Sequence, residues 1–234
     1  WIKEERRKMG HKYRQNRLKR GLIALLLLAA LVPTQVSSVQ AADAVVSMPC
    51  GEAEFNSALA AVQAGGGTLT FSCGIDPFII TFTWMKVITS NVTIDGGGRV
   101  SLSGGGATYL FLVNSGAALT LKKITIMDGH STGMDGGAVY NNGSLTVENS
   151  KFLNNSTDAD HSGGAIVSYG PLSINKSVFA DNHASNGGAI YPRWENAVIE
   201  ITDSSFHDNQ ALGIDGIGGA LLAWDGPHVT VSST

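Results

Sequence analysis

The chain has 234 residues, of which 43% are hydrophobic and only 15% charged, so it can bury a substantial core. Its formal net charge is −3, but residues 1–41 hold nine Lys/Arg and two Glu, so the remainder carries a formal charge of −10. Nucleic-acid binding needs basic patches, which makes such an acidic chain a poor candidate for it. The 29 glycines indicate many tight turns and argue against a helical bundle.

Residues 1–41 are predicted to be a secretory signal peptide. A basic stretch precedes the apolar run Gly21–Val32, and this run is shorter than the roughly 20 residues that span a bilayer. Small residues suited to cleavage occur at Val39–Ala41 and again at Ala42–Ala44. Residues 1–8 precede Met9 and fit no part of a signal, so we expect Met9 to be the true start.

Residues 42–74 are predicted to form an N-terminal cap. The segment Glu52–Ala64 places apolar residues at helical spacing and ends at three glycines. Thr68–Phe71 alternates as a strand. Cys50 and Cys73 lie after the signal peptide, and an oxidising compartment favours a disulfide between them. A helix tied to the first strand suits a cap, because the end coil of a solenoid otherwise exposes core and strand edges.

Residues 75–234 consist of short β-rich runs and repeat with a period near 27 residues. One signature is Gly-Gly-Ala, which begins at Gly136, Gly163, Gly187 and Gly218. The other is Phe-x-x-Asn, with Phe152, Phe179 and Phe206 spaced by 27 residues and followed by Asn155, Asn182 and Asn209. Apolar strand segments starting at Leu119, Leu145, Leu172, Ile199 and Val229 form a further column. A fixed period of this length is typical of repeat architectures.

A unit of this size with three short strands and no helix cannot bury a hydrophobic face alone. Stacking the units in parallel predicts an all-β, right-handed parallel β-helix of about six coils. The stacked phenylalanines would fill the bore, and the asparagines would form a hydrogen-bonded ladder between turns. A propeller or sandwich of hairpins is the alternative, but its Asn-Gly turn occurs at Asn142-Gly143 and is not repeated in that column.

The paired signatures resemble the repeats of the polymorphic outer-membrane protein family, within the pectin lyase-like class. The resemblance covers roughly Asp95–Thr234. It implies a right-handed β-helix on the cell surface, in that family often an autotransporter passenger and an adhesin. Thr234 falls in the middle of a coil. We therefore expect the chain to be a fragment, with membrane attachment only through a downstream anchor or barrel.

Paired carboxylates are the first candidates for chemistry. Asp181 and Asp208 occupy the same column one coil apart, with His207 beside them and Arg193 on the next strand. Equivalent positions at about 4.8 Å could approach the carboxylate spacing of retaining glycosidases, roughly 5–5.5 Å. An aspartate before a ladder asparagine is also ordinary turn chemistry, and this structural interpretation is the stronger one.

Two further groups could bind ligands. Asp158 and Asp160 precede His161 in a loop and form a weak calcium motif with too few ligands. No other cofactor is expected. Tyr140, Tyr191, Trp194 and Trp224 could form a strip on which sugars stack.

The sequence thus favours a secreted or surface-displayed adhesin or binding scaffold, with extracellular glycans or proteins of a host or neighbouring cell as partners. The alternative is a carbohydrate-active enzyme, either a polysaccharide lyase or a glycoside hydrolase. Both functions should reside where the period breaks, in loops 128–135, 158–162 and 208–216 and in the strand at 191–195.

Overall fold

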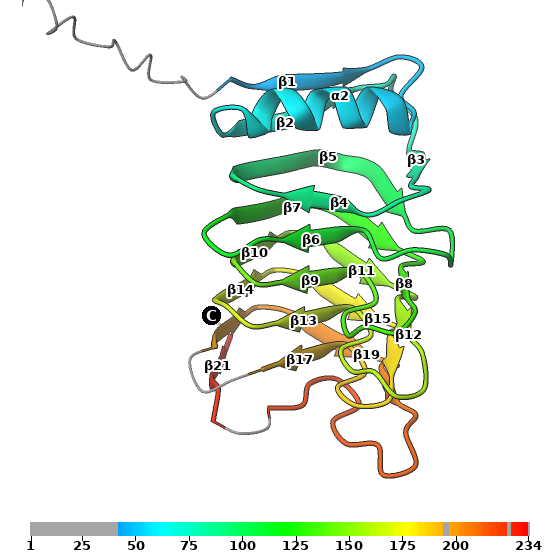
Figure 1. Ribbon diagram of the computed structural model, residues 1–234, viewed down its shortest axis with the longest axis vertical. Helices are drawn as coiled ribbons and strands as arrows, with labels where there is room; N and C mark the ends of the chain where they lie inside the picture. The colour runs from blue at the N-terminus through cyan, green and yellow to red at the C-terminus, as the bar shows by residue number, and fades with distance from the viewer. Residues whose placement is uncertain (1–41, 194–196, 224–225, 234) are drawn as a thin grey trace, which may run out of the picture. The chain divides into compact units, whose positions relative to one another are not determined.

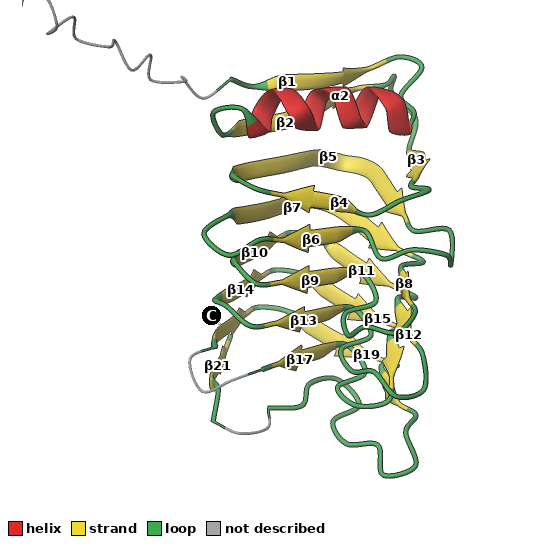
Figure 2. Cartoon of the chain, in the orientation of Figure 1, coloured by secondary structure: helices red, strands yellow, loops and turns green. Residues whose placement is uncertain are grey.

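A computed structural model describes residues 42–193, 197–223 and 226–233. In this part of the chain the backbone winds into a parallel β-solenoid of about seven turns (Figure 1). Helix α2 (Glu52–Gln63) is the only helix among the described residues, and the other regular elements are strands (Figure 2). The predicted all-β solenoid with one short N-terminal helix is therefore confirmed.

The described strands form three sheets that run along the solenoid. The long sheet has twelve strands: β1 (Ala44–Ser47), β2 (Gly67–Ser72), β3 (Phe78–Thr81), β5 (Asn91–Ser103), β7 (Ala118–Met127), β10 (Ser144–Glu148), β11 (Lys151–Leu153), β14 (Leu172–Asn175), β15 (Val178–Ala180), β18 (Val198–Thr202), β19 (Ser205–His207) and β21 (His228–Ser232). The five-stranded sheet has β4 (Lys86–Ile88), β6 (Phe111–Val113), β9 (Val139–Asn141), β13 (Ile166–Ser168) and β17 (Ile190–Pro192). The four-stranded sheet has β8 (His130–Ser131), β12 (Ser156–Thr157), β16 (His183–Ala184) and β20 (Gln210–Ala211).

Each strand pairs with the equivalent strand one turn along. Leu145 lies opposite Leu119 on one side and Leu172 on the other, and the column continues to Ile199. All strand pairs among the described residues are parallel, which excludes the hairpin alternative. A strict repeat therefore becomes a set of columns of like residues, one column for each position in the repeat.

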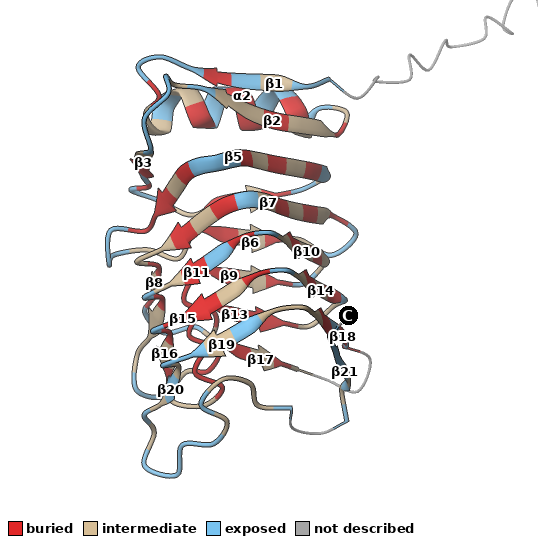
Figure 3. Cartoon of the chain, turned by 180° about the vertical axis from the view of Figure 1, so that it is seen from behind, coloured by how far each residue is buried: buried red, intermediate tan, exposed pale blue. Residues whose placement is uncertain are grey.

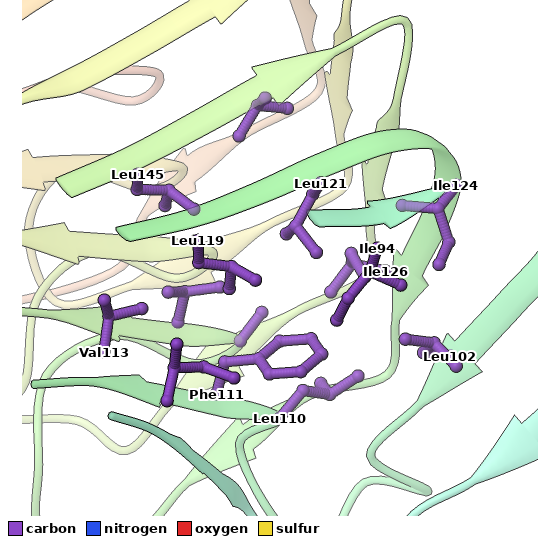
Figure 4. Packing of buried hydrophobic residues seen from close by; sticks show 14 of the residues in the cluster. Ile94, Leu102, Leu110, Phe111, Val113, Leu119, Leu121, Ile124, Ile126 and Leu145 are labelled. Atoms are coloured by element: carbon purple, nitrogen blue, oxygen red, sulfur yellow. The ribbon is translucent and has the colours of Figure 1, made fainter. Parts of the chain in front are cut away.

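Inward-facing columns form the core. Burial alternates along β5, β7, β10 and β14, as expected for strands with one face inside and one outside (Figure 3). Aliphatic side chains from successive turns meet in the bore, where Leu119 and Leu145 pack near Leu121 and Phe111 (Figure 4). The rings of Phe152 and Phe179 stack with centroids 4.8 Å apart. Phe206 continues the stack at 4.9 Å.

A ladder of asparagine side chains runs beside the phenylalanine stack. Asn155 Nδ2 donates to Asn182 Oδ1 at 2.9 Å, and Asn182 Nδ2 donates to Asn209 Oδ1 at 2.8 Å. The backbone N–H of Asn155 also donates to Asn182 Oδ1, at 3.0 Å. Asn155 and Asn182 are fully buried. Gly129 fills the equivalent position one turn earlier, and its N–H donates to Asn155 Oδ1.

A second ladder, of serines, stabilises the preceding turn. The N–H of Ser150 donates to Ser177 Oγ, and the N–H of Ser177 donates to Ser204 Oγ, each at 3.1 Å. Each hydroxyl in turn donates to the carbonyl two residues earlier in its own turn, at 2.8 Å. The serines therefore close a local turn and join it to the next one.

The N-terminal segment contributes strands as well as a cap. Strands β1 and β2 belong to the long sheet, and α2 packs on them through buried residues that include Phe55 and Leu59. Cys50 and Cys73 form a disulfide with Cα atoms 5.8 Å apart. Glu52, the first residue of α2, forms an ion pair with Lys86. Its carboxylate also accepts hydrogen bonds from the Thr83 backbone and hydroxyl.

Two local expectations were wrong. Asp95–Gly98 was expected to be a turn between two strands, but β5 continues through it with a shift in register. Glycines at φ of 62° and 78° allow this irregularity. Loops 128–135 and 208–216 were expected to lack strands, yet they contain β8 and β20. Hydrogen bonds to neighbouring turns specify such two-residue strands.

Candidate functional site

The middle residue of each strand in the five-stranded sheet faces outward. Parallel pairing aligns Leu112, Tyr140, Val167 and Tyr191 in one outward column. Their flanking residues, such as Val139 and Ile190, are buried in the core. Strand geometry thus places two tyrosines on the same outer face, with one valine between them.

The Gly-Gly-Ala segments lie directly against this column. A Cβ added to Gly136 would lie 2.8 Å from Val167 Cγ1, and one added to Gly163 or Gly187 would lie 3.2 or 3.3 Å from Tyr191 Cβ. All three glycines have positive φ, between 55° and 79°. The loops therefore cover Val167, which is fully buried despite facing outward, and restrict the position of Tyr191.

A cluster that we call the tyrosine–arginine surface forms at this column; it consists of Tyr140, Tyr169, Tyr191, Arg193 and Asp135. The rings of Tyr140 and Tyr169 stack with centroids 5.3 Å apart and planes at 27°. Arg193 Nη1 donates to the Tyr169 hydroxyl at 3.0 Å and lies 3.3 Å from Asp135 Oδ2. The guanidinium carbon is 5.3 Å from the Tyr191 ring centroid, within cation–π range.

Electrostatic interactions keep the cluster in a single protonation state. Burial, together with the neighbouring Tyr169 and Asp135, raises the pKa of Tyr140 above its usual value. The hydrogen bond with Tyr169 raises the pKa of Arg193, and Asp135 acts in the same direction. At neutral pH the surface therefore holds a neutral Tyr140 phenol beside a paired cation and anion.

The carboxylates predicted for catalysis lie elsewhere. Asp181 and Asp208 follow β15 and β19 of the long sheet, whereas Arg193 follows β17 of the five-stranded sheet. Both aspartates are exposed and have φ of 56°, in the left-handed region. Asp208 contacts His207 Nδ1 at 3.1 Å. The structure thus brings Asp181, Asp208 and His207 to one turn column and places Arg193 in another site.

That turn column has the same backbone conformation in four successive turns. Asp128 and Asn154 precede the two aspartates and have φ of 50° and 54°. Asn and Asp are the side chains that best tolerate this conformation, which explains the residue type at all four positions. A shallow polar hollow of about 390 Å³ lies at the start of the column, lined by Gly105, Gly106, Asp128, Gly129, Asn154 and Ser156.

The predicted calcium motif lies in the loop after β12. Asp158 Oδ2 accepts a hydrogen bond from the N–H of Gly133 at 3.0 Å, and Asp160 is exposed. Within the described ranges, no three His, Cys, Asp or Glu side chains gather as a metal site would require. Calcium binding at Asp158 and Asp160 stays a prediction. Trp194 and Trp224, predicted to stack on sugars, lie outside the described residues.

The comparisons with known proteins identify the repeat. Residues 176–191 match the family model described as the Chlamydia polymorphic membrane protein repeat. The chain carries this repeat. The matched segment holds Phe179 and Asn182 of the stack and ladder and the Gly-Gly-Ala beginning at Gly187, so the family signature coincides with the turn-to-turn contacts. Searches of curated proteins and of solved structures gave no significant match. No helix in the described part of the polymorphic membrane protein-like solenoid is long and apolar enough to cross a membrane.

Sequence reasoning found Tyr140, Tyr191 and Arg193 but missed Asp135 and Tyr169. Asp135 ends a loop of variable length, and Tyr169 follows β13 where the repeat is irregular. Neither residue stands in a repeating column, so the period carries no signal for it. The spacing of 27 residues between Ser150, Ser177 and Ser204 could have revealed the serine ladder.

Proposed function

We propose that this chain is a secreted or surface-displayed β-solenoid that acts as an adhesin or binding scaffold for extracellular glycans or proteins. The match to a polymorphic membrane protein repeat supports a role at the cell surface. The predicted signal peptide and disulfide agree with export. The observation that carries the proposal is the tyrosine–arginine surface, because half-buried tyrosines and a partly exposed arginine are typical of binding surfaces.

The division between inner and outer columns supports a scaffold role. The Phe stack and the Asn and Ser ladders bind one turn to the next and are mostly buried. These residues are accounted for by folding alone. The outward residues of the five-stranded sheet differ from turn to turn, so the same solenoid can present different side chains at each level.

The experiment is a binding assay on the full chain. Protein labelled with a fluorophore is added to cultured cells and to arrays of glycans and extracellular proteins, and the Tyr191→Ala, Arg193→Gln double variant is tested in parallel. Saturable binding that the double variant loses supports the proposal. An absence of saturable binding to every surface contradicts it. Digestion of intact producing cells with an external protease tests display, since a surface protein is cleaved before the cells lyse.

One observation favours the second function, a carbohydrate-active enzyme. Asp181 and Asp208 occupy equivalent positions in adjacent turns, so their backbones are about 4.8 Å apart. Polysaccharides incubated with the chain are assayed for new reducing ends and for unsaturated products. Turnover that Asp181→Asn abolishes would establish the enzyme and remove the scaffold as the main function.

A further inference from the structure

We propose that the tyrosine–arginine surface is a binding site for a neutral, hexose-based oligosaccharide that lies along the solenoid axis. This inference rests on the proposed function and assigns a ligand class to its surface. It is argued below from the rigidity of the site, its charge and its dimensions.

The site is preorganised. Asp135 Oδ1 accepts the N–H of Ser162 at 2.7 Å, while its Oδ2 holds Arg193. Arg193 is held in turn by the Tyr169 hydroxyl, and Tyr169 stacks on Tyr140. Each side chain is thus fixed by at least one other, so little side-chain entropy is lost when a ligand binds.

The charges favour a neutral ligand. Asp135 is 13% exposed and already compensates Arg193, so the site has no unpaired positive charge to attract an anion. The described solenoid also lies in the part of the chain with a formal charge of −10, which repels acidic polymers. The guanidinium has five N–H donors, and its contacts with Asp135 and Tyr169 engage Nη1. With 42% of the Arg193 side chain exposed, donors remain on the solvent side for vicinal hydroxyls.

The aromatic groups define the direction and length of the ligand. Tyr140 and Tyr191 lie on either side of Val167, two strand spacings apart, or about 10 Å. Amphipathic tyrosine rings can contact the apolar C–H face of a pyranose while their hydroxyls bond to its oxygens. A single pyranose ring is too short to contact both positions, so the site suits an oligosaccharide that crosses the strands.

The test measures affinity of the full chain for defined probes. The probes are hexasaccharides of β-1,4-glucan, β-1,4-mannan and α-mannan, with oligogalacturonate and heparin fragments as acidic comparisons and titration calorimetry as the readout. We expect micromolar-to-millimolar binding of at least one neutral probe, weakened at least tenfold by Tyr191→Ala and by Arg193→Gln. Lys151→Ala is the matched control, because Lys151 is exposed on β11 of the long sheet, and it should bind as the parent does.

Folding of each variant is checked by circular dichroism and melting. Tyr191→Phe keeps the ring and removes only the hydroxyl, so it should lose part of the affinity without a change in melting. The proposal is overturned if no neutral probe binds, if only acidic probes bind, or if Tyr191→Ala and Arg193→Gln bind as the parent does. A chain that still binds cells but no neutral probe overturns this inference and leaves the adhesin standing. A chain that binds neither overturns both.

Discussion

Replacing Asn182 with alanine removes the central rung of the asparagine ladder. Its amide donates to the Phe152 carbonyl at 3.0 Å and to Asn209 Oδ1, and its Oδ1 accepts from the N–H and from the amide of Asn155. The variant keeps the backbone N–H of Asn182, which still donates to Asn209 Oδ1. It leaves the Phe152 carbonyl and the Asn155 N–H without partners in a site that is fully buried.

Each buried group left unsatisfied costs about 1–3 kcal/mol. Two such groups predict a loss of about 3–5 kcal/mol, less if a water enters the space left by the amide. This is a large share of the roughly 5–15 kcal/mol that stabilises a typical domain. The measurement is urea unfolding of the full chain followed by circular dichroism, with the free energy of unfolding compared with that of the parent.

Asn154→Asp is the matched control, because Asn154 is the exposed neighbour of the ladder and aspartate also tolerates its left-handed backbone. We expect it to change the free energy of unfolding by less than about 0.5 kcal/mol. Hydrogen exchange gives a local readout, since the Asn155 N–H should exchange faster in Asn182→Ala. A loss below about 1 kcal/mol together with unchanged exchange at Asn155 would refute the ladder as a major source of stability.

Three further changes test other contacts. Burial opposes ionisation of Glu52, but hydrogen bonds from Lys86 and Thr83 outweigh it and lower its pKa from 4.5 to about 2; the carboxylate therefore adds at most about 3 kcal/mol above pH 4.5, which is lost as the pH falls toward 2, and Glu52→Gln should flatten unfolding free energy against pH over that range. Cys50→Ser should cost about 2–4 kcal/mol, and a reductant should then leave the melting temperature unchanged while lowering that of the parent. Gly164→Ala should cost about 3 kcal/mol or more, because its Cβ would overlap the backbone of Gly188 and His183, whereas Gly116→Asn enters open space and should melt near the parent temperature.

The fold followed from the sequence wherever one position repeats in every turn. Phe152 and Phe179 stack because their spacing of 27 residues equals one turn of the solenoid, and the same spacing aligns Asn155 with Asn182. The short strands β8 and β20 could not be predicted in this way. They have two residues each and are specified by hydrogen bonds from the neighbouring turn, so local composition carries almost no signal for them.

The candidate site was predicted only in part, for a related reason. Tyr140 and Tyr191 belong to one strand position, so the repeat placed them on a common face. The partners of Arg193 come from a loop before β9 and from the segment after β13, at sequence separations of 58 and 24 residues that match no single turn of the repeat. Contacts of this kind depend on how each loop folds back, which a period cannot specify.

The same reasoning bears on whether the acidic turn column is catalytic. A catalytic pair requires two particular carboxylates, whereas a left-handed turn requires only a residue type that tolerates positive φ. The column has this conformation in four successive turns, and one of the four residues is Asn154, which cannot act as an acid or a base. Backbone geometry therefore explains Asp181 and Asp208 together with Asp128 and Asn154, and a catalytic role would have to explain only two of the four. The Arg193–Asp135 pair has no such structural explanation, because no turn or ladder of the solenoid depends on it. For this reason the tyrosine–arginine surface, and not the most acidic column, is where binding should be sought first.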